Sequence, residues 1–306
     1  MGKKIMVTGG AGFIGSQLTN KLAKCGTKVY VVDNLYHSTA HYIVEPSVEL
    51  IEADLSDTDC YAGLLNEVDT VVHLAAAGNV IQSIEDPILN YKNNVLCTIS
   101  LLEEVRLSNC NKIIFSSTGG ALMGNTAPPI SENSVPNPIS PYGASKLACE
   151  AYLRAYAASY NLAFTIFRFG NVIGPNCAHK AGVVQKYFHS IKNNLDLEVY
   201  GDVSRDFIFS GDLVNIMDDC LRVRLPQNET FLLASGKETK IFDLARKILV
   251  QFPASHSKII KKSGRIGEVG KNYADISKFR SLYPSYQFIG LNEALQTALD
   301  YLIDVE

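Results

Sequence analysis

The stretch MVTGGAGFIGS, from Met6 to Ser16, interrupts an apolar run with spaced glycines and then becomes apolar again. Gly9, Gly12 and Gly15 lie where glycines permit a tight turn, a close approach of a pyrophosphate to the backbone, and close packing of a helix on a strand. Gly10 begins a second match, because it starts a GxGxxG spacing. With a strand before it and a helix after it, the turn presents helical N–H groups and a positive dipole end to the phosphates. The stretch therefore predicts a dinucleotide-binding turn.

One acidic residue, Asp33, follows at the spacing that such a turn requires, and a second, Asp54, is either an adenine-side residue or a plain turn residue. Asp33 ends the next apolar run, KVYVVD, 18 positions after Gly15. A carboxylate there accepts hydrogen bonds from the adenosine ribose diol and repels a 2′-phosphate. Because no arginine follows it closely, we expect NAD rather than NADP. Asp54 and Leu55, in EADLSD, come at the end of a third apolar run, a position that lies near the adenine in this fold.

Short apolar runs rich in Val and Ile alternate with segments of helical spacing over roughly the first 170 residues. The segments 13–25, 94–107 and 145–160 have this helical spacing. The alternation is typical of βαβ units and predicts an α/β fold, a Rossmann-type doubly wound parallel sheet covered on both faces. After Pro175 the pattern loosens, and TFLLASG is expected to be a strand of this later part. We expect an NAD-binding domain at 1–170 and a smaller C-terminal substrate-binding subdomain at 171–306, partly interleaved with it.

The amino-acid composition argues against some classes of binding partner. The chain has 306 residues, of which 47% are hydrophobic and 19% charged, and its formal net charge is −3. This balance, without a run of Lys or Arg, predicts no nucleic-acid or membrane partner. No secretory or membrane-spanning pattern is recognisable, and scattered, unpaired cysteines indicate reduced thiols, so we expect a cytoplasmic location. His37 and His41 are expected in a loop without a third ligand, so no metal site is predicted.

A reactive group of side chains is indicated in the second half of the expected sheet. Tyr142 and Lys146 are four residues apart at the start of a helical segment, which puts both side chains on one face. The nearby ammonium, with the positive charge of the cofactor, is expected to lower the phenol pKa and make Tyr142 a base toward a hydroxyl. Ser116, Ser117 and Thr118 follow the fifth strand, at the sheet edge where ligands bind, and Thr118 is placed to hydrogen-bond the reacting hydroxyl.

Together these motifs carry a resemblance to a known family. The quoted matches are TGGAGFIGS, DNL, HLAA, SST, PYGASK, RFGNVIGP and RDFIF, and GRIGEV with YADISK extends them toward the C-terminus. The chain resembles an extended short-chain dehydrogenase/reductase of the NAD-dependent sugar-nucleotide epimerase/dehydratase family. Within that family it is most similar to UDP-glucose 4-epimerase-like members.

The resemblance implies specific roles. It implies a Ser/Thr–Tyr–Lys triad at Thr118, Tyr142 and Lys146, with Thr118 also contacting substrate. It implies that Asn171 contacts the substrate diphosphate. Arg205 and Arg265 are implied to clamp the nucleotide phosphates, which suits the bidentate guanidinium. The implied NAD contacts are Gly9, Gly12, Phe13, Ile14, Gly15, Asp33, Asn34, Asp54, Leu55, Leu74, Ala75, Ala76, Ser116, Tyr142 and Lys146. Relatives pair the helices equivalent to 94–107 and 145–160, so a homodimer is expected.

One feature separates the possible reactions. Family dehydratases resemble one another in placing Asp-Glu directly after the triad Thr, whereas Gly119 and Gly120 follow Thr118 here, and no carboxylate occurs before Glu132. Elimination would lack its acid and base, whereas a 4-epimerase needs neither. The resemblance thus favours NAD-dependent 4-epimerisation of a nucleotide sugar, a UDP-hexose of the UDP-glucose, UDP-N-acetylglucosamine or UDP-glucuronate type.

Other readings stay open at this point. A nucleotide-sugar reductase or dehydrogenase of the same family would release reduced cofactor, and a dehydratase is a further alternative. A non-catalytic NAD-binding module is another, although it has no need of a base such as Tyr142. The segment GDVSRDF is shorter than the common family pattern, and Met123 stands where many relatives carry Tyr. Both departures leave the shape of the sugar pocket open.

Overall fold

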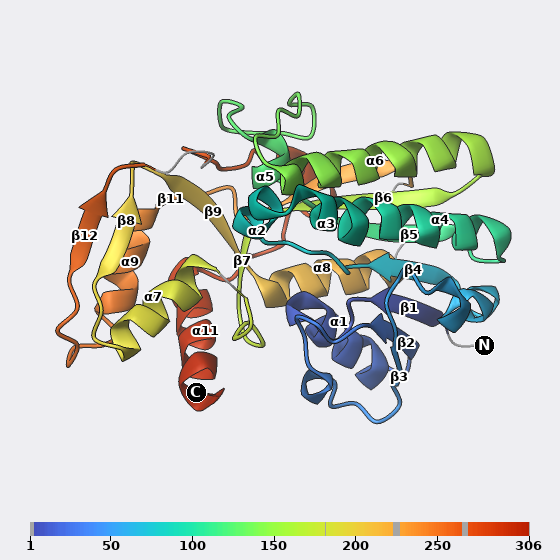
Figure 1. Ribbon diagram of the computed structural model, residues 1–306, viewed down its shortest axis with the longest axis horizontal. Helices are drawn as coiled ribbons and strands as arrows, with labels where there is room; N and C mark the ends of the chain where they lie inside the picture. The colour runs from blue at the N-terminus through green and yellow to red at the C-terminus, as the bar shows by residue number, and fades with distance from the viewer. Residues whose placement is uncertain (1–2, 181, 223–226, 265–268, 306) are drawn as a thin grey trace. The chain divides into compact units, whose positions relative to one another are not determined.

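The computed structural model describes residues 3–180, 182–222, 227–264 and 269–305. Its main sheet has seven strands in the spatial order β10-β6-β5-β4-β1-β2-β3 (Figure 1). The strands are β1 (Lys4–Thr8), β2 (Lys28–Asp33), β3 (Glu49–Glu52), β4 (Thr70–His73), β5 (Lys112–Thr118), β6 (Ala163–Phe169) and β10 (Glu229–Leu233).

The order of the strands creates the reversal at which doubly wound sheets bind ligands. Strand β1 pairs in parallel with β2 on one side and with β4 on the other. The chain moves outward from β1 through β2 to β3 and then returns to β4. Thr8, the last residue of β1, is in register with Val32 and with His73. The turn after β1 and the loop after β4 therefore leave the sheet at one edge, as the predicted fold requires.

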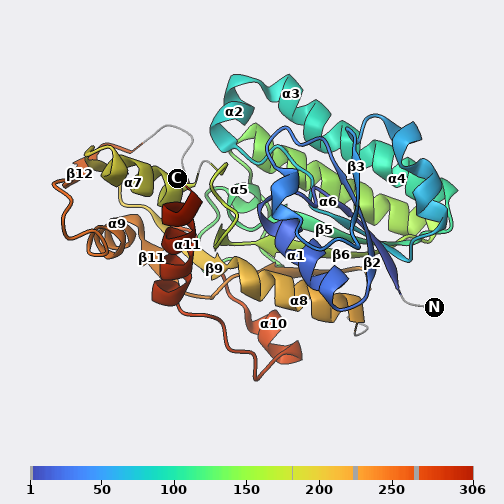
Figure 2. The same ribbon diagram turned by 90° about the horizontal axis from the view of Figure 1, so that it is seen from below.

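Helices cover both faces of this sheet, which confirms the doubly wound prediction. Helix α1 (Phe13–Lys24) and helix α8 (Ser210–Arg222) lie on one face, and α4 (Cys97–Leu107) and α6 (Pro141–Tyr160) lie on the other (Figures 1 and 2). Two short helices, α2 (Val80–Glu85) and α3 (Pro87–Tyr91), pack against α6. The side chains between the sheet and α4 and α6 are fully buried and apolar, and they include Met6, Val71, Leu101, Ile113, Phe115 and Leu153. Burial of apolar surface on this scale is the main stabilising term.

The structure corrects the predicted extent of the main sheet. The residues TFLL of the stretch TFLLASG lie in β10, at the edge of the main sheet, so this sheet is not confined to the first 170 residues. Asn228 holds it there, because its N–H donates to the Phe164 carbonyl (2.7 Å) and its Oδ1 accepts from the Phe164 N–H (3.1 Å). Pairing between distant segments leaves no signal in the local sequence pattern.

Helix α6 begins at Pro141, four residues before the expected start at Ser145. The Ser140 hydroxyl caps it by accepting from the Gly143 N–H, and proline suits the first helical position. The helix expected from Asn94 is preceded by a π-helical segment, η4 (Lys92–Leu96).

The described chain divides into two compact units. The first comprises residues within 1–118, 140–168 and 213–231, and the second comprises residues within 119–139, 169–212 and 232–306. The first unit carries the main sheet with its helices.

The second unit is built on smaller sheets. Strands β7 (Asn171–Ile173), β9 (Ser204–Phe209) and β11 (Glu238–Lys240) form one, and β8 (Leu197–Tyr200) pairs in parallel with β12 (Ile259–Lys262). Its helices are α5 (Gly120–Met123), α7 (Val183–Lys192), α9 (Ile241–Leu249), α10 (Ser277–Leu282) and α11 (Leu291–Val305). Helix α9 packs on β8 and β12, and α11 packs on β7, β9 and α7 (Figure 1). Over the described residues, no helix has both the length and the apolar character needed to span a bilayer.

Candidate active site

The glycine turn has the geometry that its sequence predicts. Gly9 has a positive φ of 69°, and its carbonyl accepts from the Gly12 N–H at 3.2 Å. A Cβ on Gly15 would lie 2.1 Å from the Gly9 oxygen, so only glycine allows helix and turn to approach this closely. Helix α1 begins at Phe13, and its N-cap, Gly12, makes no side-chain capping hydrogen bond. Gly12 therefore adds no side-chain cap of its own at this helix end, which suits an anion there.

Asp33 is buried at the end of β2 and holds the glycine turn. Its Oδ2 accepts from the Ala11 N–H at 3.0 Å, and its Oδ1 accepts from the Leu35 N–H (3.0 Å) and the Ser38 hydroxyl (2.7 Å). A carboxylate has about four acceptor positions, so Oδ2 retains one for a ribose hydroxyl. Asp33 therefore fits its predicted role and also organises the turn, which the sequence pattern did not indicate.

Asn34 and Asp54 lie together beside Asp33. The Asn34 Nδ2 donates to Asp54 Oδ2 at 2.9 Å, and the Ser56 N–H and hydroxyl both donate to Asp54 Oδ1. Burial raises the pKa of Asp54, but hydrogen bonds from Ser56 and Asn34 outweigh it and hold the pKa below its ordinary value. Leu55, the next residue, is buried. The structure thus brings the predicted adenine-side residues together in an ionised, hydrogen-bonded group.

The loop after β4 lies against the glycine turn. The Leu74 N–H donates to the Thr8 carbonyl at 3.0 Å, and a Cβ on Gly9 would meet the Ala75 nitrogen at 2.6 Å. The structure therefore gathers most of the predicted cofactor residues at one edge of the main sheet: Gly9, Gly12, Phe13, Ile14, Gly15, Asp33, Leu74, Ala75 and Ala76.

Tyr142 and Lys146 occupy the first turns of α6, in the same unit. A Cβ on Gly78, in the loop after β4, would lie 3.9 Å from the Tyr142 hydroxyl, which places this hydroxyl at that loop. Lys146 is 3% exposed, and its Nζ donates to the Ser116 carbonyl at 2.9 Å and lies 4.6 Å from the centre of the Phe115 ring. Thr118 ends β5 two residues after Ser116.

The ionisation of this pair differs from the sequence expectation. Burial raises the pKa of Tyr142 to about 12 and lowers the pKa of Lys146 to about 8. The chain by itself therefore does not lower the phenol pKa. The physical reason is that burial removes water from the phenolate and so disfavours it. The ammonium of Lys146, which is bound to a carbonyl, does not offset this loss.

Asn94 supports the site and was not anticipated from the sequence. It is buried in the π-helical segment η4, where its Oδ1 accepts from the Ala77 N–H at 2.8 Å. Its Nδ2 lies 3.1 Å from the Ser145 hydroxyl on α6 and 3.2 Å from the Ala77 carbonyl. It thus links the loop after β4 to the helix of Tyr142 and Lys146. Such π segments often occur at functional sites, but no single-sequence pattern marks them.

His73 is a hydrogen-bonded core residue at the end of β4. Its Nδ1 lies 2.6 Å from the Thr8 hydroxyl, and its Nε2 lies 3.0 Å from the Thr98 hydroxyl. Because the Thr98 hydroxyl donates to the Asn94 carbonyl, it accepts from His73, so we assign the proton to Nε2. Burial lowers the pKa of His73 to about 3, which keeps the ring neutral.

Of the predicted substrate residues that the structure describes, Asn171 and Arg205 lie in the second unit and Thr118 lies in the first. Asn171 begins β7 and is in register with Phe207 of β9, two residues after Arg205. The Arg205 Nη1 donates to the carbonyls of Ser204 and Gly270, each at 2.8 Å. Arg265 lies outside the described residues.

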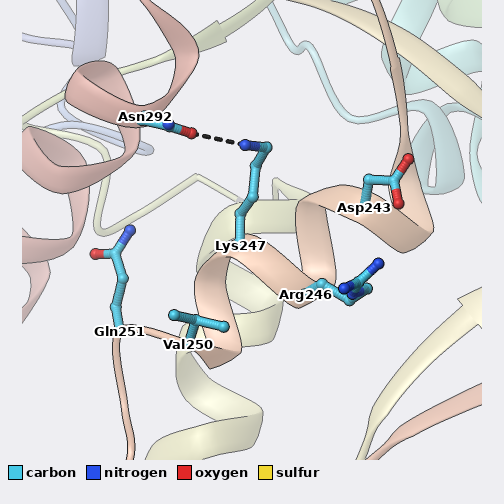
Figure 3. Close-up of a pocket in the computed structure, with 6 residues that line it drawn as sticks. All are labelled: Asp243, Arg246, Lys247, Val250, Gln251 and Asn292. Carbon is cyan, nitrogen blue, oxygen red and sulfur yellow. Dashed lines mark hydrogen bonds between the residues drawn. The ribbon is translucent and has the colours of Figure 1, made fainter.

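A large surface hollow of the second unit is separate from all of these residues. Its volume is about 580 Å³, and it is lined by Asp243, Arg246, Lys247, Val250, Gln251 and Asn292 (Figure 3). Lys247 donates to the Asn292 Oδ1 at 2.8 Å across it. Among the described residues, none of those predicted to bind cofactor or substrate lines this hollow.

Comparison with known proteins identifies the family of this chain. The model of the NAD dependent epimerase/dehydratase family matches residues 5–234. A putative UDP-glucose 4-epimerase of Methanocaldococcus jannaschii is 36% identical over 284 residues, covering 91% of this chain and 92% of that protein.

Two solved structures extend the comparison. The UDP-glucose 4-epimerase of Thermotoga maritima, solved with UDP-glucose, has a TM-score of 0.91 and 30% identity over 99% of both chains. The UDP-glucuronic acid 4-epimerase of Bacillus cereus, solved with UDP-glucuronic acid and NAD, has a TM-score of 0.91 and 26% identity over 99% of this chain and 100% of that one. This chain belongs to the NAD dependent epimerase/dehydratase family.

Proposed function

We propose that the chain is an NAD-dependent nucleotide-sugar 4-epimerase acting on a UDP-hexose of the glucose, N-acetylglucosamine or glucuronate type. The observation that carries this proposal is the placement of Tyr142 and Lys146. Both lie at the start of α6, beside the carboxyl end of β5, in the same unit as the glycine turn. The relatives named above are 4-epimerases of UDP-sugars, which supports the choice of reaction and of nucleotide.

The residues at the sheet edge fit NAD. The glycine turn and the first turn of α1 would hold the pyrophosphate, and the free position on Asp33 Oδ2 would accept a ribose hydroxyl. Asn34 and Asp54 would lie at the adenine end, and Lys146 at the nicotinamide end. When bound, NAD supplies acceptance and return of a hydride at the sugar C4.

Tyr142 is the proton carrier of the proposed reaction. It takes the proton from the C4 hydroxyl of the sugar and returns it to the 4-keto oxygen after the sugar has turned its other face. Lys146, four residues after Tyr142 on α6, supplies a positive charge, and Thr118 orients the hydroxyl. Asn171 and Arg205 would bind the diphosphate, as the family resemblance implies.

Carboxylates near the triad in sequence are already engaged, which favours epimerisation over elimination. Gly119 and Gly120 follow Thr118 directly. Glu132, the next acid along the chain, accepts from the Leu232 N–H at 2.7 Å. Glu150 is paired with Arg168. A dehydratase needs an acid and a base besides the tyrosine, and these carboxylates are committed elsewhere.

The experiment that tests the proposal is NMR of the purified protein with UDP-hexoses, UDP-N-acetylhexosamines and UDP-uronates, with and without added NAD. We expect the C4 epimer of one sugar class, without net NADH. Net NADH at 340 nm would favour a dehydrogenase, and a 4-keto-6-deoxy product would show a dehydratase.

We also propose that the protein is a cytoplasmic homodimer. Large apolar side chains are exposed on α2, α3, η4 and α6, and we call them the helix-face patch: Ile81, Ile84, Ile88, Leu89, Tyr91, Leu96, Tyr152 and Tyr160. Helices α2, α3, α4 and η4 all pack against α6, so the patch lies on one helical layer. A second copy would cover this layer. Seven free cysteines, five of them buried, support a reducing compartment.

A further inference from the structure

A buried ion pair lies one helical turn beyond Lys146. Glu150 of α6 is 2% exposed, and Arg168 of β6 is 4% exposed. The Arg168 Nε donates to Glu150 Oε1 at 2.9 Å, and its Nη2 donates to Oε2 at 2.7 Å. The Ser117 hydroxyl of β5 also donates to Oε1, at 2.6 Å. Three elements of the first unit therefore meet at one carboxylate.

These contacts involve the two elements that carry the triad. Lys146 and Glu150 are four residues apart on α6, so their side chains lie on one face. On β5, Ser117 lies between Ser116, whose carbonyl accepts from Lys146, and Thr118. Helix α6 is thus attached to β5 twice, by Lys146 to Ser116 and by Glu150 to Ser117.

We propose that Glu150, Arg168 and Ser117 form a positioning network for the triad, which sets both the register of α6 against β5 and the charge environment of Lys146. Glu150 is the residue of the pair that acts on Lys146 directly, and Arg168 limits its negative charge. The network itself touches neither sugar nor nicotinamide in this proposal. The inference rests on the proposed function, because it concerns how Lys146 serves Tyr142.

The groups that face Lys146 are few. Glu150 and Cys149 of α6 both raise its pKa, against the larger lowering effect of burial. From β5 it meets the Ser116 carbonyl and the Phe115 ring, and from β4 it faces His73, which is neutral. Glu150 is therefore the carboxylate that acts on this ammonium among the described residues.

The test is the titration of Lys146 in two variants of the same ion pair. One variant removes the negative charge of Glu150, and the other removes the positive charge of Arg168. Glu150→Gln keeps the Ser117 hydrogen bond but leaves the Arg168 charge, so Lys146 should titrate about one pH unit lower. Arg168→Met leaves Glu150 uncompensated, so Lys146 should titrate at higher pH. We would follow ¹³Cε-lysine resonances in NAD-saturated protein, with Lys146 assigned by its loss in Lys146→Arg. The alkaline limb of kcat should move in the same two directions.

Controls separate this role from a purely structural one. Asp218→Asn breaks an ion pair with Arg222 on α8, at 2.7 Å, whose guanidinium is exposed, and should leave the titration of Lys146 unchanged. Because loss of one buried partner can prevent folding, Glu150→Met/Arg168→Met removes both charges together, a change that is often tolerated. We expect Lys146 of that double variant to titrate below the wild type, since the charge of Glu150, which raises the pKa of Lys146, is lost.

The outcomes are distinct. An unchanged Lys146 titration in every folded variant, or a shift in the same direction in both single variants, would overturn the proposal. Because this titration needs no sugar, it can support the network even where every sugar in the panel remains unchanged. A panel in which no sugar is epimerised would count against the proposed function and not against the network.

Discussion

Burial controls the ionisation of single residues around the triad. It raises the pKa of Tyr142 to about 12, and it lowers the pKa of Lys146 to about 8 and that of His73 to about 3. Each shift favours the neutral form, because loss of hydration penalises charge. The site is therefore arranged so that an added positive charge, such as that of a bound nicotinamide, would have a large effect on Tyr142.

Replacing Tyr142 tests the base directly. Tyr142→Phe removes only the hydroxyl, so kcat for C4 epimerisation should fall about 10²- to 10⁴-fold, while NAD affinity changes little. The measurement is NMR of the epimer together with calorimetric titration of NAD. Tyr152→Phe, on the exposed side of the same helix, is the matched control and should keep its activity. Equal activity of Tyr142→Phe and wild type would exclude Tyr142 as the proton carrier.

Because burial lowers the pKa of His73, we expect the stability of the fold to depend on pH. Its pKa is about 3 in the fold and about 6.5 when unfolded. Below pH 6.5 the unfolded chain binds a proton that the fold does not, so stability falls as the pH drops toward 3, by at most about 1.4 kcal/mol per pH unit. His73→Gln should show a smaller slope of unfolding free energy between pH 7 and pH 5, measured in urea. A slope equal to that of the wild type would contradict this assignment.

At the scale of elements, helix caps and strand-pairing partners decide where elements begin and where they lie, which the local sequence pattern leaves open. The glycine turn, the strand before it and α1 follow directly from MVTGGAGFIGS, because the glycines, the apolar run and the helical spacing all act locally. The start of α6 depends on the Ser140 cap, and the place of β10 depends on contacts with β6. The π segment around Asn94 has no local signature at all.

Gly15 tests the glycine turn as an element. In Gly15→Ala the new Cβ would lie 2.1 Å from the Gly9 oxygen and 2.8 Å from the Gly10 Cα, so backbone must move. We expect loss of soluble protein or at least a tenfold (about 1.4 kcal/mol) weaker affinity for NAD, measured by calorimetry. Gly63→Ala is the control, because nothing lies within 4 Å of its Cβ position. Wild-type affinity in Gly15→Ala would show that the turn adapts.

At the scale of the whole molecule, the helix-face patch makes the oligomeric state testable. Ile88, on α3, is 64% exposed. Ile88→Asp would place a charge in a contact that excludes water, so the dimer should dissociate to half its mass by size-exclusion chromatography with light scattering. Val250→Asp, on an apolar position that is 78% exposed in the second unit, should leave the mass unchanged. A monomeric wild type at all concentrations would refute the dimer.

Much of the fold and of the site was readable from the chain alone. The dinucleotide turn, Asp33 at its spacing, the Tyr142–Lys146 pair and the alternation of strands and helices are local patterns, and local patterns report local structure. The resemblance supplied the family, which the matched relatives bear out.

Other properties depend on residues that are distant in sequence. The partners of Asp33, Asn94 and Glu150 come from other elements, and the pKa of Tyr142 depends on burial by the whole unit. The sequence expectation of a lowered phenol pKa included the positive charge of the cofactor. In the chain by itself, the lost hydration raises the pKa of Tyr142 instead. Burial and long-range hydrogen bonds exist only once the chain has folded, and no local pattern carries them.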